Sequence, residues 1–158
     1  MKTPQIRLLL LIAALFIGAV NAYGEDLAII VAKTSPLDSV TTAELQKYFK
    51  AEKTKMPDGT KIVLVMQALG QPAHDAALQL IYKMSETEYN DYFVGQVFTG
   101  AVASAPKSFP TAAAVISYVA ANSGAMSYVR ASDANDTVKV LKIDGKAPGE
   151  ADYSLKMK

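Results

Sequence analysis

Three polar side chains in one short loop have the chemistry of a small binding site. Gln67, Gln71 and His74 lie within eight residues, and the glycine at position 70 allows a tight turn between them. The segment leads from the end of an apolar, β-branched run into a proline that suits the first turn of a helix. In open α/β sheets, ligands bind at this edge, where strands end and helices begin.

We therefore predict that Gln67, Gly70, Gln71 and His74 form a ligand-binding loop. The two amides and the imidazole could contact a small anion or a polar solute there, assisted by the positive end of the helix dipole. The simpler alternative is that residues 70–72 form only a turn with a satisfied helix cap, because a helix start is necessary but not sufficient for anion binding.

The amino-acid inventory argues against catalysis and against a bound metal. The chain of 158 residues has no cysteine and one histidine, which excludes thiol nucleophiles, disulfides and multi-histidine metal sites. His74 and Asp75 are sequence neighbours, which point in different directions on a helix and cannot act as a base and its orienting group. No Gly-x-Ser-x-Gly nucleophile motif occurs. We expect no enzyme activity, no cofactor and a histidine on the surface.

Strands alternate with helices along the chain, which is the pattern of an α/β domain with a largely parallel sheet. Capping boxes at residues 41–44 and 85–88 mark two helix starts. The expected strands are residues 27–32, 62–66, 125–129 and 138–143, and the expected helices begin near residues 41, 72, 85 and 111. Residues 100–110 are expected to form a loop.

Four aromatic residues, Tyr82, Tyr89, Tyr92 and Phe93, gather around one expected helix junction. Aromatic side chains could form a contact surface for a partner protein. Core packing with the hydroxyls directed to water is the interpretation that we favour.

The charge is close to balanced, with 16 basic and 15 acidic residues and a formal net charge of +1. Hydrophobic residues make up 51% and charged residues 20%, a composition that excludes disorder and coiled coil. Without a basic excess or a Lys/Arg cluster, a nucleic-acid partner is not expected.

The first 22 residues have the order of a secretory signal peptide: Lys2 and Arg7, an apolar run over residues 8–20, and a small residue, Ala22, at the cleavage position. The apolar run of 13 residues is shorter than the roughly 20 that span a bilayer. We predict cleavage after Ala22, a mature domain over residues 23–158, a periplasmic location and no stable membrane insertion.

The order of motifs resembles the phosphate-type substrate-binding proteins of ABC transporters, a branch of the type II periplasmic binding proteins. Residues 123–129 (SGAMSYV) are similar to the family's pGAIGYV strand, and the resemblance rests on the order and spacing of all the segments together. The other matching segments are residues 27–33, 41–45, 57–60, 62–67, 92–93, 98–100, 115–119, 140–146 and 153–155. The resemblance implies a single lobe of this fold, because the family's early TGAGA-like segment has no counterpart here.

The resemblance also implies a weakened phosphate site. The family places an arginine where this chain has Gln67, and a Ser-Gly-Thr triplet where it has Gln71, Pro72 and Ala73. Charge-assisted hydrogen bonds contribute roughly 1.5–3 kcal/mol each. Losing two of them would weaken phosphate binding by about two to four orders of magnitude.

Two functions follow as hypotheses. The first is an exported, non-catalytic solute-binding protein that takes a small anion or polar solute at residues 67–74. The second is a one-lobe scaffold that has lost the phosphate site and serves as an interaction or assembly component of a cell-envelope machine, with an envelope protein or a second copy as its partner. An exposed apolar face would favour the second hypothesis.

Overall fold

The computed structural model describes residues 25–158, and the predicted signal peptide at residues 1–22 lies outside this part of the chain. The elements are β1 (Leu27–Ala32), β2 (Ser39–Val40), α1 (Thr42–Phe49), β3 (Val63–Gln67), α2 (Pro72–Ala77), the π-helical turn η1 (Leu78–Tyr82), α3 (Glu86–Phe98), β4 (Lys107–Phe109), α4 (Ala112–Ala121), β5 (Ala125–Arg130), the 3-10 turn η2 (Ala131–Asp133), β6 (Val138–Val140) and β7 (Lys142–Ile143).

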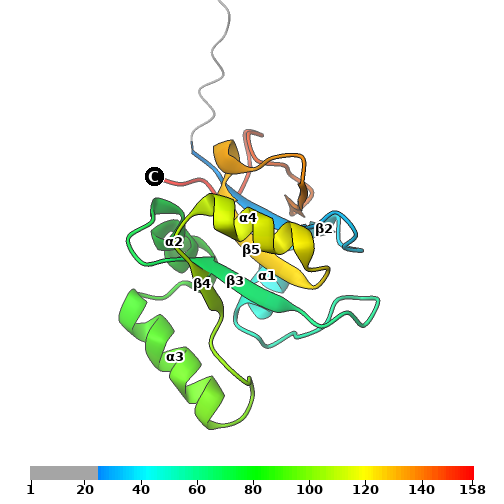
Figure 1. The fold of residues 1–158 in the computed structure, drawn as a ribbon. Helices are drawn as coiled ribbons and strands as arrows, with labels where there is room; N and C mark the ends of the chain where they lie inside the picture. Colours follow the sequence, from blue (N-terminus) through cyan, green and yellow to red (C-terminus); the bar gives the residue numbers. More distant parts are fainter. Residues whose placement is uncertain (1–24) are drawn as a thin grey trace, which may run out of the picture.

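The central sheet has the strand order β4-β3-β5-β1-β6. Strand β3 pairs in parallel with both β4 and β5, whereas β1 pairs antiparallel with β5 and β6. Four of the five strands therefore run in one direction and β1 runs against them, so the predicted α/β fold with a mostly parallel sheet is confirmed. The parallel strands β3, β4 and β5 end at the same edge of the sheet (Figure 1).

Two local predictions need correction. Residues 138–143 do not form one strand, because β6 pairs with β1 while β7 pairs with β2 in a separate two-stranded sheet. Residues 107–109, which we expected in a loop, form β4. This short strand is not apolar, and it is held by parallel pairing with residues 65–67 of β3, a contact that only the tertiary fold supplies.

The helices begin where the capping residues predict. Thr41 accepts a hydrogen bond from the Glu44 backbone and Ser85 accepts one from the Glu88 backbone, and in each case the glutamate side chain returns a contact to the cap. These capping boxes satisfy backbone donors that the first helical turn would otherwise leave unpaired.

Helices cover both faces of the sheet, and the core is divided accordingly. On β1, Leu27, Ile29 and Val31 face one hydrophobic cluster, and Ala28 and Ile30 face the other. Helix α4 covers the second cluster, while α1, α2 and η1 contribute to the first. Figure 1 shows α4 on the near side of the sheet and α1 behind it.

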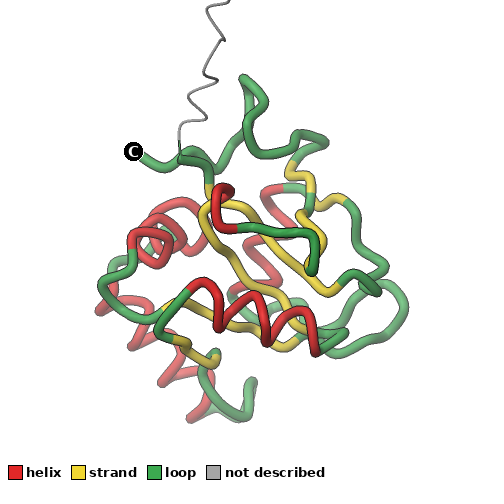
Figure 2. The backbone as a smooth tube through the Cα atoms, turned by 45° about the horizontal axis from the view of Figure 1, so that its top comes forward, coloured by secondary structure: helices red, strands yellow, loops and turns green. Residues whose placement is uncertain are grey.

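The C-terminal segment lies beside the start of β1 (Figure 2). The Leu27 amide donates to the Leu155 carbonyl at 2.9 Å, and the buried Tyr153 hydroxyl donates to the Leu27 carbonyl at 2.7 Å. The end of the chain is therefore part of the core. Among residues 25–158, we find no helix that is long and apolar enough to cross a membrane.

Candidate functional site

The loop between β3 and α2 is a tight turn that leaves polar side chains at the edge of the sheet. The Gln71 amide donates to the Ala68 carbonyl at 3.3 Å, and Gly70 takes a left-handed φ of 83° that favours glycine. Gln71 precedes the helix as its N-cap residue but makes no side-chain capping bond. Its amide group is therefore available for another partner.

A cavity of about 320 Å³ opens beside this turn, between the starts of α2 and α4. The end of β5 and the turn η2 close a third side. It is lined by Gln67, Gln71, Pro72, Ala73, Pro110, Thr111, Ala112, Ala113, Arg130 and Asp133. The cavity thus occupies the edge where parallel strands end, which is the place that ligands use in open α/β sheets.

Gln67 lines this cavity and carries a buried hydrogen-bond donor. The residue is 3% exposed, and its Nε2 atom has no hydrogen-bond partner among the described residues. Leaving a buried polar group without a partner costs about 1–3 kcal/mol of stability. A ligand acceptor placed in the cavity would recover this interaction.

The N-terminus of α4 adds backbone donors. The Thr111 hydroxyl accepts from the Ala114 amide at 3.2 Å, and the Thr111 carbonyl accepts from the Val115 amide at 3.1 Å. The amides of Ala112 and Ala113 belong to the same first turn, where no earlier helical carbonyl can pair with them. No acidic residue lies in this turn to offset the positive end of the helix dipole.

Arg130 brings positive charge to the cavity, but this charge is compensated. Its Nε donates to Asp133 Oδ2 at 3.0 Å, and its Nη1 lies 3.4 Å from Glu25 Oε1. The hydrogen bond to Asp133 is the main cause that raises the pKa of Arg130. The lining is consequently rich in donors but close to neutral.

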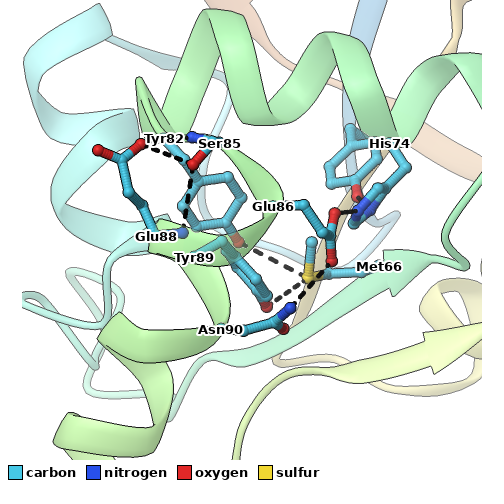
Figure 3. A network of polar contacts seen from close by, with 9 residues as sticks. Met66, His74, Tyr82, Ser85, Glu86, Glu88, Tyr89 and Asn90 are labelled. Atoms are coloured by element: carbon cyan, nitrogen blue, oxygen red, sulfur yellow. Dashed lines mark hydrogen bonds and ion pairs between the residues drawn. The ribbon is translucent and has the colours of Figure 1, made fainter.

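His74 is buried, so the prediction of a surface histidine is wrong. The residue is 4% exposed, and its Nε2 lies 2.7 Å from Glu86 Oε2 (Figure 3). Its Nδ1 lies 3.1 Å from the Tyr128 hydroxyl. The side of α2 that carries His74 faces the sheet, where these two groups satisfy both ring nitrogens. Burial raises the pKa of Tyr128 well above its usual range, which keeps its hydroxyl protonated.

The tyrosine cluster packs in the core, as we favoured from the sequence, but the expectation that its hydroxyls point to water is wrong. Tyr82 and Tyr89 meet edge to face, with ring centroids 4.9 Å apart, and both hydroxyls point to the Met66 sulfur (Figure 3). Phe93 packs 4.8 Å from the Tyr89 ring. Burial raises the pKa of Tyr82 and of Tyr89. Only Tyr92 is half-buried, and its hydroxyl donates to the Lys50 carbonyl at 2.8 Å.

The structure brings together two of the four predicted binding residues. Gln67 and Gln71 line the cavity, Gly70 forms the turn beside it, and the His74 ring is held by Tyr128 and Glu86 rather than lining it. Within residues 25–158, no three carboxylate or imidazole groups gather in a way that could hold a metal ion.

The sequence analysis did not assign Thr111 and Arg130 to the binding site, although the position of each in the sequence indicates that it could belong there. Thr111 was identified as a helix start and Arg130 directly follows an expected strand. Ligands bind at the edge where parallel strands end, and we used this rule only for the strand that ends at Gln67. Its use for every expected strand would have identified Arg130 as well. Their approach to Gln67 depends on β3 lying next to β5, which the sequence pattern does not reveal.

Comparison with solved structures confirms the class of fold that the motifs predicted. The chain superposes on a phosphate ABC transporter substrate-binding protein from Clostridium perfringens, solved with bound phosphate, with a TM-score of 0.64 and 18% identity. An ABC-type phosphate transport receptor from Vibrio cholerae gives a TM-score of 0.67 at 17% identity, and PstS from Borrelia burgdorferi gives 0.66 at 13%.

The match extends over most of this chain but only about half of each solved protein. It covers 78%, 83% and 85% of this chain, and 47%, 53% and 55% of the Clostridium, Vibrio and Borrelia chains respectively. The chain therefore has the fold of phosphate ABC transporter substrate-binding proteins over the extent of a single lobe. No protein-family model and no curated protein matches the sequence.

Proposed function

We propose that this protein is an exported, non-catalytic solute-binding protein that holds a small anion or polar solute between the starts of α2 and α4. The observation that carries the proposal is the buried Nε2 of Gln67, a donor that has no partner within residues 25–158, at the strand-end edge of the fold. Residues 1–22 serve as the signal peptide, residues 23–158 form the binding domain, and the protein works in the periplasm.

The residues that line the cavity determine which hydrogen-bonding groups and which charge a solute needs in order to bind. The Gln67 amide and the Ala112 and Ala113 backbone groups are donors, so the solute presents acceptor oxygens. Arg130 is paired with Asp133, which leaves little net charge to attract a dianion. A neutral or singly charged solute with carbonyl or carboxylate oxygens suits this site better than phosphate, and Gln71 can contact it at the rim.

Calorimetric titration of the protein with phosphate, acetate and acetamide tests the proposal. We expect acetate or acetamide to bind in the millimolar range or tighter, with phosphate weaker. Gln67→Met should reduce binding at least tenfold, because it removes the buried donor while keeping a similar volume. Gln79→Met is the matched control, since Gln79 is exposed and outside the cavity. Absence of heat with all three compounds, or unchanged binding by Gln67→Met, would contradict the proposal.

Export can be tested separately from binding. The mature protein recovered from the periplasm should begin at Tyr23, as measured by intact mass, because cleavage is expected after Ala22. A recovered chain that keeps residues 1–22, or one found only in the cytoplasm, would contradict the proposed location.

A second candidate function is that of a docking component in the cell envelope. The observation that favours it is the exposure of large apolar side chains on one helix: Phe98 is 90% exposed, Val94 69% and Val97 41%. Adjacent exposed apolar residues on a monomer indicate an interaction site more often than isolated ones do. This function does not need a solute in the cavity, so the two candidates can be tested independently.

A further inference from the structure

Helix α3 carries an apolar groove that the other residues of the range 25–158 do not cover. Tyr89 and Phe93 form its floor from the buried side of the helix, and Val94, Val97 and Phe98 stand exposed around it. With Asn90 and Ala105 the lining encloses about 400 Å³. Figure 1 shows α3 lying beyond β4 at the margin of the fold, where it packs on η1.

The charges on α3 are of one sign. Glu86, Glu88 and Asp91 lie in its first half, and the helix has no lysine or arginine. Asp91 lies three residues before Val94 and seven before Phe98, a spacing that places all three on one side of the helix. The Glu86 carboxylate, which also contacts His74, lies near the groove, since Asn90 Nδ2 donates to Glu86 Oε1 at 3.5 Å. Asp91 and Glu86 therefore place negative charge beside the apolar lining of the groove.

These charges discriminate among the surfaces that could cover the groove. A second copy would bring another acidic α3, so that like charges would face each other. Helix α3 is about 20 Å long, and one such face is small compared with the roughly 1,200–2,000 Å² that a stable dimer interface buries. An anionic membrane surface would be repelled as well. A partner with basic residues next to apolar ones would be attracted.

We infer that the α3 groove is a docking site for a basic amphipathic helix of an envelope protein. Apolar side chains of that helix would cover Phe98, Val94 and Val97, and a lysine or arginine side chain would meet Asp91. Docking a helix in an apolar groove is a recurring mode of recognition in which residues one turn apart act as anchors. The inference rests on the second candidate function and is independent of the Gln67 cavity.

The test uses a defined probe, a fluorescein-labelled 14-residue peptide of leucine and lysine in a helical amphipathic pattern. Fluorescence anisotropy with the protein at physiological salt should show saturable binding. The corresponding leucine–glutamate peptide should bind at least tenfold more weakly, because its charges oppose those of α3. If the lysine peptide does not bind, or if both peptides bind equally, the inference is overturned.

Variants locate the binding. Phe98→Ser should weaken binding of the lysine peptide at least tenfold, since exposed aromatic anchors contribute most to such interfaces. Asp91→Lys should weaken the lysine peptide and strengthen the glutamate peptide. Leu69→Ser is the matched control: Leu69 is also 69% exposed but lies in the β3–α2 loop, so binding should not change. An equal loss with Leu69→Ser would overturn the inference.

Two further measurements separate the alternatives. Sedimentation velocity should show a monomer; a dimer that Phe98→Ser dissociates would mean that a second copy covers the groove, which overturns the inference. Gln67→Met should bind the lysine peptide like the unmodified protein. Failure of solute binding with intact peptide binding would therefore count against the cavity proposal alone.

Discussion

The Nε2 atom of His74 lies 2.7 Å from Glu86 Oε2, and this contact joins α2 to the first turn of α3. On its other side, the His74 ring meets the Tyr128 hydroxyl of β5 at 3.1 Å. One buried imidazole thus connects the helix beside the solute cavity, the central sheet and the helix that carries the apolar groove.

His74→Ala should destabilise the fold by about 2–4 kcal/mol, because it leaves a cavity and removes the partner of the buried Tyr128 hydroxyl. Urea unfolding monitored by circular dichroism measures the change. Asp75→Ala is the neighbouring control; Asp75 is exposed, so its loss should cost less than about 1 kcal/mol. Equal effects of the two variants would contradict a structural role for the imidazole.

Gln67→Met should stabilise the protein without ligand by about 1 kcal/mol, because it replaces a buried donor that has no partner with an apolar side chain of similar length. The same change should weaken solute binding at least tenfold, because a buried polar group that lowers stability is expected where it serves binding. Thermal unfolding in buffer without solute measures the gain. A clear loss of stability would show that the Gln67 amide has a structural role.

Gly124→Ala should destabilise the protein by about 1–3 kcal/mol, since a Cβ at this position would lie 2.2 Å from the Lys61 carbonyl oxygen and force the backbone to shift. Gly95→Ala is the contrasting control. A Cβ there meets open space within α3, so alanine should stabilise by about 0.5–1 kcal/mol. Denaturant midpoints of both variants check the opposite signs.

Acid should weaken the fold partly through Asp144. Hydrogen bonds from the side chain and backbone of Thr42 hold the pKa of Asp144 below its usual value of 3.8. Because the folded state favours the carboxylate, this stabilisation is complete above the unfolded pKa and is lost as the pH falls through the folded pKa. Stability measured from pH 7 to pH 3 should fall less steeply in Asp144→Asn, which is already weaker at pH 7. Parallel curves would contradict this assignment.

Tyr153→Phe should cost about 1–2 kcal/mol, because the buried Tyr153 hydroxyl donates to the Leu27 carbonyl at 2.7 Å. Tyr118→Phe is the control, since the half-buried Tyr118 hydroxyl accepts only from Lys107 at the surface. Urea unfolding should separate the two variants. A negligible effect at Tyr153 would mean that the C-terminal segment contributes little to the stability of β1.

Local patterns predicted the elements of this fold because their causes are local. The Thr41 and Ser85 capping boxes and the apolar run of β1 act through near neighbours in the sequence, and they appear where we expected them. Strand β4 was not predictable in this way. Its residues, Lys107 to Phe109, have no strand pattern of their own and are held by pairing with β3.

The sequence by itself determined the α/β class, the helix starts and the strand-end position of Gln67. Only the tertiary structure decided that Arg130 and Thr111 share a cavity with Gln67, that His74 is buried between Tyr128 and Glu86, and that Phe98 is left uncovered. The physical reason is distance along the chain. Capping and periodicity depend on residues within one or two turns, whereas burial and pairing depend on groups that only the packed sheet brings together.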